Sequence, residues 1–404
     1  MTKASAYKHF AVIILVALIS VSGIALPYPI LAPIFMDEVA TDFNRFLNIP
    51  AELLFAVALA IYPLGILVGS SFIGALSDLF GRRSTLTVTL FFAALGYCFT
   101  AWAVMIEHYP LFILARFLTG LCEGNVSVCR ALALDLDPHI EKTRAMSLLN
   151  ATFYTGYLVG PLAGGYLMDF GNDAAFWVAA VATLFALAVV HFLLGESTQP
   201  KEKASLVLLR SKIITHNSFR LLKERPIRRV FIIYLLLAMG INSLYEYYPL
   251  WLVTDFAASS MQIGIATAVL TLFMIISSAF AVTYWKHRLG LATGAMIAMF
   301  GLTASLFSYG LYDYSSLLWI GFPITGCFIA LVNGMMPVYF SERFGEFGQG
   351  RIMGLLTSTF CLANVVMALL GGIIALLSPL YSIFFGAVLI LFSMFLFKFQ
   401  PKNS

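Results

Sequence analysis

The sequence predicts an all-α integral membrane protein with twelve transmembrane helices arranged in two six-helix halves. Its composition, a series of long apolar stretches and an internal repeat all support this fold class. The 404 residues are 61% hydrophobic and 11% charged, whereas soluble globular proteins average about 45–50% apolar and about 25% charged residues. So few charged side chains cannot cover the surface of soluble domains of this length, which excludes a soluble enzyme.

Long apolar stretches recur along the whole chain. A helix needs about 20 apolar residues to cross about 30 Å of hydrocarbon. Twelve stretches of that length are predicted as transmembrane helices, at residues 10–35, 53–76, 84–106, 111–134, 145–168, 174–195, 230–254, 260–284, 289–311, 315–340, 351–377 and 380–400. The first stretch is too long for the apolar region of a signal peptide, so we expect it to be retained as a helix.

Lysine and arginine are distributed unevenly between the two sides that these stretches define. The side that holds the N-terminus receives 21 of the 24 basic residues, the other side receives only Arg45, and Arg116 and Arg130 lie inside a stretch. Basic residues are enriched on the cytoplasmic side of a membrane. We therefore expect a multi-pass protein of the cell (inner) membrane with both termini in the cytoplasm.

A polar segment near the midpoint divides the chain. Residues 196–229 are rich in Lys, Arg and Ser and are predicted to form a cytoplasmic linker, with an amphipathic helix around 206–222 on the membrane surface. The linker separates an N-terminal six-helix bundle at 1–195 from a C-terminal six-helix bundle at 230–404. Six helices on either side predict two halves related by a pseudo-two-fold axis.

The two halves share an internal repeat at a constant offset of 207 residues. Without a gap, the repeat aligns Asp135 with Glu342, Arg144–Phe153 with Arg351–Phe360, and Gly164-Gly165 with Gly371-Gly372. Two parallel six-helix repeats are the layout of transporters whose substrate site lies between the halves, near the membrane midplane.

Four ionisable residues inside predicted helices are candidates for a functional site, because hydrocarbon penalises charge by about 2.5–3.5 kcal/mol. Arg116, Glu123 and Arg130 are spaced by seven residues in the fourth stretch, which places them on one face of a continuous helix. Glu246 lies in the seventh stretch. We expect these four residues to form a proton-coupling site with Glu123 as the proton carrier. The alternative is a structural polar network in which Glu123 neutralises an arginine.

The gap after the second stretch reads Gly74-Ala-Leu-Ser-Asp78-Leu-Phe-Gly81-Arg82-Arg83, which resembles the G-x-x-x-D-R-x-G-R-R signature of the major facilitator superfamily. The resemblance implies that the aspartate and the two arginines form a clamp, which latches the two halves together on the cytoplasmic side. Leu79 replaces the usual basic residue, so we expect a weaker clamp.

Further matches to the same superfamily follow along the fourth stretch. Arg116-Phe-Leu-Thr-Gly120 resembles the intramembrane arginine that the family follows with glycine. Asp135 and Arg144 resemble the charged pair that the family places between its fourth and fifth helices. The resemblance therefore adds this pair to the cytoplasmic clamp.

The fifth stretch contains Gly156-Tyr-Leu-Val-Gly160-Pro161-Leu-Ala-Gly164-Gly165, a full match to the G-x-x-x-G-P-x-x-G-G motif that is typical of drug:proton antiporter branches. Glycines four residues apart share one face, so we expect a neighbouring helix from the other half to approach to backbone contact. The proline removes a backbone donor and kinks the helix. The resemblance implies the major facilitator fold and its twelve-helix drug:proton antiporter branch.

In that superfamily the first and seventh helices line the central cavity. The resemblance makes Asn242 and Tyr245, which neighbour Glu246, candidate substrate-cavity residues. The alternative is an aromatic belt at the outer interface, with Glu246 near the headgroups. Three polar residues of other stretches are further cavity candidates, or else join helices to one another: Asn150, Asn333 and Asn364.

The energy source follows by elimination, and the substrate class is what the resemblance to drug:proton antiporters implies. No G-x-x-x-x-G-K-[ST] phosphate loop occurs, and no metal-binding His pair, cysteine cluster or Ser-His-Asp arrangement stands out. We therefore expect no enzyme, cofactor, metal or nucleic-acid partner. The prediction is a monomeric secondary transporter in the lipid bilayer that exports amphipathic small molecules in exchange for protons. The alternatives are a proton-coupled importer of a nutrient or metabolite and, less compatible with the buried charges, a non-transporting receptor.

Overall fold

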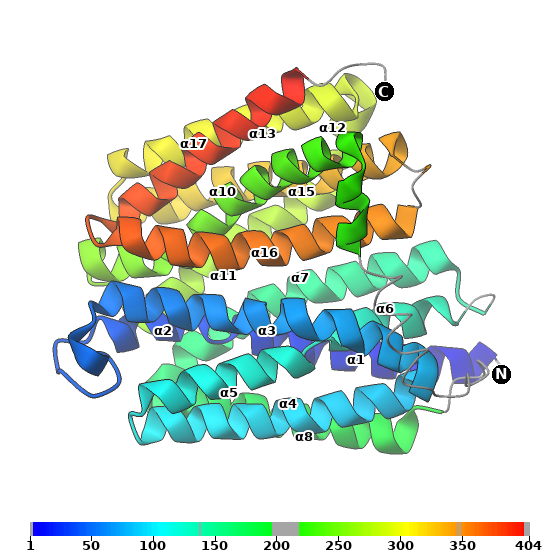
Figure 1. The fold of residues 1–404 in the computed structure, drawn as a ribbon, viewed down its shortest axis with the longest axis horizontal. Coiled ribbons are helices and arrows are strands. Elements are labelled where there is room, and N and C mark those ends of the chain that lie inside the picture. Colours follow the sequence, from blue (N-terminus) through cyan, green and yellow to red (C-terminus); the bar gives the residue numbers. More distant parts are fainter. Residues whose placement is uncertain (1–2, 137–138, 196–217, 345, 347–348, 400–404) are drawn as a thin grey trace. The chain divides into compact units, whose positions relative to one another are not determined.

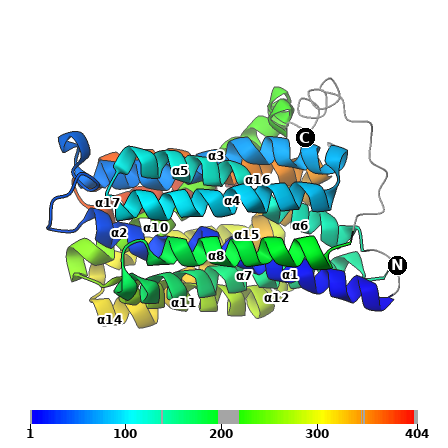
Figure 2. The same ribbon diagram turned by 90° about the horizontal axis from the view of Figure 1, so that it is seen from below.

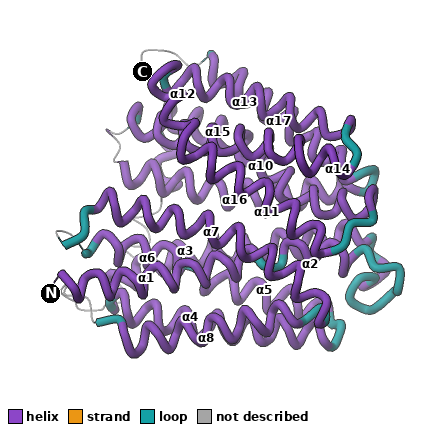
Figure 3. The backbone as a smooth tube through the Cα atoms, turned by 180° about the vertical axis from the view of Figure 1, so that it is seen from behind, coloured by secondary structure: helices purple, strands orange, loops and turns teal. Residues whose placement is uncertain are grey.

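The computed structural model describes residues 3–136, 139–195, 218–344, 346 and 349–399. Within these ranges every regular element is a helix, as the purple tube in Figure 3 shows. Most of the predicted linker, and with it most of the predicted amphipathic helix, falls outside the described residues.

Packing divides the chain into two compact units. One comprises Met1–Leu47 and Ile61–Asn217, and the other comprises Asn48–Ala60 and Ser218–Ser404. The units therefore follow the two halves of the sequence except at residues 48–60, which pack with the second half.

The first half of the chain contains α-helices of eight to thirty residues, joined by turns and, between α2 and α3, by the longer connection 36–50. They are α1 (Lys3–Ala25), α2 (Tyr28–Phe35), α3 (Ala51–Phe80), α4 (Arg82–Met105), α5 (Tyr109–Cys122), α6 (Asn125–Leu134), α7 (Lys142–Leu167) and α8 (Ala174–Leu193). Short 3₁₀ turns, η1 (Phe46–Asn48) and η2 (Met168–Phe170), lie in the connections.

The second half follows a similar order but includes two π-helical segments. After the 3₁₀ turn η3 (Ser218–Lys223), its elements are α10 (Arg225–Phe256), α11 (Ser260–Ile276), the π-helix η4 (Ser277–Ala281), α12 (Val282–Leu289), α13 (Leu291–Phe307), the 3₁₀ turn η5 (Ser308–Leu311), α14 (Tyr314–Ser316), the π-helix η6 (Leu317–Gly321), α15 (Phe322–Arg343), α16 (Gln349–Ala375) and α17 (Pro379–Lys398). α10 begins five residues before the predicted start at 230.

Eleven helical spans in the described chain are long and apolar enough to cross a membrane. Each corresponds to one of the predicted stretches. The remaining stretch, the fifth, corresponds to α7, which is not among them, although its 26 residues would extend about 39 Å. Its glycine, threonine and asparagine residues lower its mean hydropathy.

The same pattern of helix neighbours recurs in both units. In the first, α7 packs on α1, and α4 packs on α5 and α8 (Figures 1 and 2). In the second, α16 packs on α10, and α13 packs on α15 and α17. α7 and α16 are the helices that align in the sequence repeat, and each packs against the first long helix of its own unit.

Gly156, Gly160 and Gly164 recur at every fourth residue of α7 and are here called its glycine ladder. This ladder explains the contact of α7 with α1. A Cβ atom at Gly160 would lie 2.6 Å from the carbonyl oxygen of Ser22, and one at Gly164 would overlap the carbonyl oxygen of Leu26. The prediction that a helix of the other half fills this face is therefore wrong. The glycines instead let α1 approach α7 to backbone contact within the first unit.

Two of the predicted continuous helices are interrupted. The first stretch divides into α1 and α2 at Leu26-Pro27, where proline supplies no backbone N–H. The fourth divides into α5 and α6 at Glu123-Gly124. This second interruption places a candidate functional residue at a helix junction.

Candidate functional site

Glu123 is the residue at which α5 ends. Its backbone N–H bonds to the carbonyl of Gly120, three residues back instead of four, and its φ and ψ angles are −83° and 24°. Gly124 follows, and its carbonyl accepts from the backbone N–H and the side chain of Ser127 at the start of α6. A local change from α to 3₁₀ bonding inside a long helical span is typical of a hinge.

The Glu123 side chain is buried, with 3% of its residue surface exposed. The hydroxyl of Tyr97 in α4 donates a hydrogen bond to Glu123 Oε1 across 3.0 Å. Glu123 Oε2 is buried and has no hydrogen-bond partner among the described residues. One oxygen of the carboxyl is therefore fixed and the other is open to a proton.

Arg116 lies on the same helix, seven residues before Glu123, and is also buried, with 4% exposed. Its guanidinium carbon lies 4.0 Å from the ring centroid of Tyr62 in α3, a cation–π contact. A Cβ atom at Gly120 would lie 3.1 Å from the Cα of Gly65, so glycines bring α3 and α5 together beside this contact. The Arg116 Nε and Nη1 atoms have no hydrogen-bond partner in the part of the chain that is described.

Asn125 completes the polar surroundings of the helix junction. It is fully buried at the start of α6, and the hydroxyl of Thr89 lies 2.6 Å from its Oδ1. Together with Glu123, Arg116, Tyr62 and Tyr97 it forms what we call the junction cluster. Sequence analysis identified only the arginine and the glutamate, because tyrosines in aromatic-rich helices give no distinctive signal.

Arg130 does not belong to the junction cluster. Its guanidinium carbon lies 5.0 Å from the ring centroid of Phe153 in α7. The predicted single stripe of Arg116, Glu123 and Arg130 assumed a continuous helix and is wrong, because the helix is interrupted between the second and third of these residues.

Glu246 is the second buried carboxyl, in α10 of the second unit. Only 1% of its surface is exposed, and neither carboxyl oxygen has a hydrogen-bond partner among the described residues. Tyr247 and Tyr248, which follow it in the chain, are equally buried, and their hydroxyls bond to the Ala368 carbonyl and to Thr267. The alternative of a headgroup-exposed aromatic belt does not fit such burial.

Two of the predicted cavity asparagines join helices. Asn364 Nδ2 of α16 lies 3.5 Å from Asn242 Oδ1 of α10, and Asn242 Nδ2 lies 3.4 Å from the carbonyl oxygen of Phe360. Tyr245 Oη lies 3.3 Å from the sulfur of Met274 in α11. Among the remaining candidates, Asn150 is exposed and Asn333 is half-buried.

The predicted clamp residues gather where α4 begins. Gly81, with a φ of 91°, precedes the helix. Arg82 Nε lies 2.5 Å from Asp135 Oδ2, and an Arg83 nitrogen lies 2.6 Å from the His191 carbonyl oxygen. These contacts lie within the first unit.

Other members of the predicted clamp are placed differently or fall outside the description. Arg144 is exposed, and the predicted pairing of Asp135 with it is replaced by the ion pair to Arg82. The surroundings of Gly74 and of the Asp78 side chain lie outside what the structure describes. In the repeat, Glu342 takes the place of Asp135, and Lys286 Nζ lies 3.7 Å from its Oε1.

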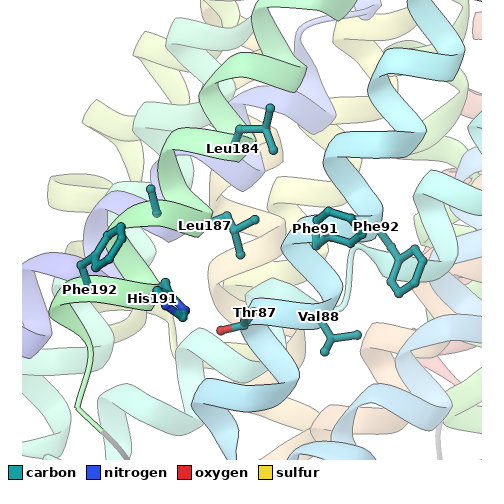
Figure 4. Close-up of a pocket in the computed structure, with 9 residues that line it drawn as sticks. Thr87, Val88, Phe91, Phe92, Leu184, Leu187, His191 and Phe192 are labelled. Atoms are coloured by element: carbon teal, nitrogen blue, oxygen red, sulfur yellow. The ribbon is translucent and has the colours of Figure 1, made fainter.

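A surface groove of about 400 Å³ lies between α4 and α8 and does not involve the junction cluster (Figure 4). Its walls are almost entirely apolar, with Phe91 and Phe92 on one side and Leu184 and Leu187 on the other. The predicted site residues take no part in it.

The fold, the repeated units and the buried charges define a polytopic membrane transporter. A sequence model of the Major Facilitator Superfamily matches residues 10–254 and 230–404. The chain therefore belongs to the major facilitator superfamily.

Individual relatives refine this assignment. The tetracycline resistance protein, class C, of Escherichia coli is 28% identical over 355 residues, which cover 85% of this chain and 83% of that protein. Multidrug resistance protein 2 of Bacillus subtilis (strain 168) is 24% identical over 336 residues, 81% of each chain. These matches make the chain similar to the drug:proton antiporter branch.

Solved structures share the fold at low sequence identity. A D-xylose-proton symporter superposes with a TM-score of 0.76 at 17% identity over 98% of both chains. The human organic anion transporter MFSD10 superposes with a TM-score of 0.68 at 19% identity over 97% of this chain and 99% of that one. Since these transporters differ in substrate, the likeness shows the fold alone.

Proposed function

We propose that this protein is a secondary transporter that exports amphipathic small molecules in exchange for protons. It would act as a monomer with twelve transmembrane helices, α7 included, in a cell membrane with both termini in the cytoplasm. Its functional halves would be 1–195 and 230–404, connected by the linker 196–229 and related by a pseudo-two-fold axis.

The junction cluster is the observation on which the proton coupling rests. Glu123 is buried with one carboxyl oxygen free of hydrogen bonds. A buried ionisable residue in a membrane helix is costly, and a stabilising structural role would require partners for both oxygens. Glu123 therefore suits reversible protonation better than a permanent structural charge.

The mechanism uses the chemistry of the cluster in two states. When Glu123 is ionised, its charge is compensated electrostatically by Arg116 on the same helix and by the hydrogen bond from Tyr97. When a proton adds at Oε2, the arginine keeps its charge and its contact with Tyr62 while the negative charge disappears. The net charge at the helix junction thus changes by one with each proton. Glu246 would provide a second protonation site, with Arg130 outside the cluster in a supporting role.

The relatives support the substrate class and the direction. Proteins named for tetracycline resistance and multidrug resistance match over most of this chain, and tetracycline and multidrug substrates are amphipathic. The candidate cavity residues Asn242, Tyr245, Asn150, Asn333 and Asn364 provide polar contacts of the kind such substrates need, and they remain part of the proposal.

Purified protein in proteoliposomes tests this proposal. With an imposed pH gradient, tetracycline or ethidium should accumulate against its own gradient in wild type. Glu123→Gln should retain the fold and probe binding but lose the proton-driven accumulation. The exposed Glu141→Gln serves as a matched control and should transport normally. Undiminished uphill transport by Glu123→Gln would contradict the proposal, and accumulation in the direction of proton flow would indicate an importer.

A further inference from the structure

Tyr97 and Gly23 form an arrangement around Glu123 that the proposed function does not assign. The Tyr97 hydroxyl donates to Glu123 Oε1 across 3.0 Å, and Oε2 has no partner among the described residues. We infer that Tyr97 is a positioning residue, which holds one carboxyl oxygen so that the other receives the proton. This inference rests on the proposed function of Glu123.

Gly23 of α1 makes room for the tyrosine hydroxyl. A Cβ atom at Gly23 would lie 2.9 Å from Tyr97 Oη and 3.4 Å from Cζ. Since Gly23 and Tyr97 are both buried, even a methyl group there would push the phenol away from its present place. On the other side, a Cβ atom at Gly96 would overlap the side chain of Thr119, so α4 is fixed closely against α5. The close approach of Gly23 to the phenol and of Gly96 to the Thr119 side chain therefore restricts where the hydroxyl lies.

The hydrogen bond persists in both protonation states. Oε1 accepts from Tyr97 whether the carboxyl is ionised or carries a proton on Oε2, so proton uptake and release require no change of partner. The bond is stronger to the ionised form, because hydrogen bonds to charged acceptors are stronger than those to neutral ones. Tyr97 therefore contributes to the pH at which the carboxyl takes up its proton.

Few other charged or titratable groups surround this carboxyl. Arg116 of α5 and Tyr62 of α3 interact with it electrostatically, and Cys122 is its neighbour in the chain. α6 contributes the amide of Asn125, and α1 has no titratable side chain between Ile13 and Ala25. The effect of Tyr97 can be separated from theirs because its hydroxyl can be removed alone.

The expected results follow from the geometry. Tyr97→Phe deletes the donor and should raise the midpoint of carboxyl protonation by about one pH unit. Gly23→Ala displaces the hydroxyl and should shift the midpoint in the same direction. In the Tyr97→Phe background, Gly23→Ala should add nothing, because the hydroxyl on which it acts is gone. Tyr166→Phe, an exposed tyrosine of α7, makes the same chemical change and should leave the midpoint unchanged.

Infrared difference spectroscopy of the full chain in liposomes measures this midpoint without substrate. The signal is the carbonyl-stretch band of the protonated carboxyl that Glu123→Gln removes. An unchanged midpoint in Tyr97→Phe would overturn the inference and leave the proposed function standing. An equal shift by Gly23→Ala with and without the hydroxyl would overturn the assigned role of Gly23. If Glu123→Gln removes no titrating band, the proposed function itself fails.

Discussion

Arg82 Nε lies 2.5 Å from Asp135 Oδ2, which joins the first residue of α4 to the residue that ends α6. The side chains of this ion pair are 14% and 20% exposed. In the repeat, Glu342 takes the place of Asp135 and pairs with Lys286, which does not align with Arg82; this pair is longer at 3.7 Å and has side chains 48% and 59% exposed. The two ion pairs share an equivalent acidic residue and differ in basic partner, length and burial.

This difference predicts unequal energies for the two ion pairs. Asp135→Asn should lower the free energy of unfolding by about 1–3 kcal/mol, because it removes one charge of an ion pair whose side chains are mostly buried. Glu342→Gln should cost less than about 1 kcal/mol. Thermal unfolding of the purified protein measures both. The swapped double variant Arg82→Asp with Asp135→Arg should recover part of the loss, and equal costs at the two sites would argue against a role for burial.

The glycine ladder of α7 predicts that added side chains lower the free energy of unfolding by different amounts at its three positions. Gly156→Ala should be the mildest change, because its Cβ would meet the Val21 side chain at 2.8 Å, which can move. Gly160→Ala should be worse, and Gly164→Ala worst, since each would meet a backbone carbonyl oxygen, that of Ser22 in α1 and that of Leu26 just after α1. We expect losses of about 1–3 kcal/mol in unfolding free energy for the latter two.

Transport measured alongside unfolding tests whether this α1–α7 contact matters for function. Gly160→Leu should impair both properties. Val159→Leu adds volume on the exposed side of the same turn and should affect neither. A fully stable and active Gly160→Leu protein would mean that α1 and α7 do not need their close contact.

Arg116 should not tolerate replacement by lysine. The contact with the Tyr62 ring at 4.0 Å depends on a planar, weakly hydrated cation. Arg116→Lys should therefore cost about 1–2 kcal/mol of unfolding free energy. The same substitution should cost clearly less in a Tyr62→Leu background, and equal costs in the two backgrounds would exclude coupling between these side chains.

We expect Glu246 to lower the stability of the protein and at the same time to support its transport activity. Because neither of its buried oxygens has a hydrogen-bond partner in the described structure, Glu246→Leu should raise the free energy of unfolding by about 1–3 kcal/mol. The same variant should reduce proton-driven accumulation of the transported probe. A destabilised protein would instead indicate that the carboxyl stabilises the fold through polar contacts.

Much of the fold follows from local sequence. The stretches predicted at 174–195 and 380–400 form α8 (Ala174–Leu193) and α17 (Pro379–Lys398), because the length of an apolar run directly limits the length of a membrane helix. The internal repeat aligns α7 with α16, and each of these helices packs on the first long helix of its own unit, although the repeat did not specify that neighbour. The helix lengths, by contrast, depend on residues close together in the chain.

The candidate site was less predictable because it depends on contacts between distant residues. Glu123 could be identified as a buried charge, but its partner Tyr97 is one of several aromatic residues in α4 and carries no local signal. A glycine ladder likewise indicates that a helix approaches closely without specifying which one, so α1 was not anticipated as the neighbour of α7. The helix interruption at Glu123 was missed since a single glycine inside an apolar run is compatible with an unbroken helix.

The position of Glu123 at the end of α5 has one more consequence. Most side chains that change charge must transmit the effect through neighbours before a backbone segment can reorient. Here the carboxyl belongs to the residue where the regular backbone bonding of the helix stops. A change in its charge would act directly at the junction between α5 and α6. It would need no other side chain to transmit the effect to the orientation of α6.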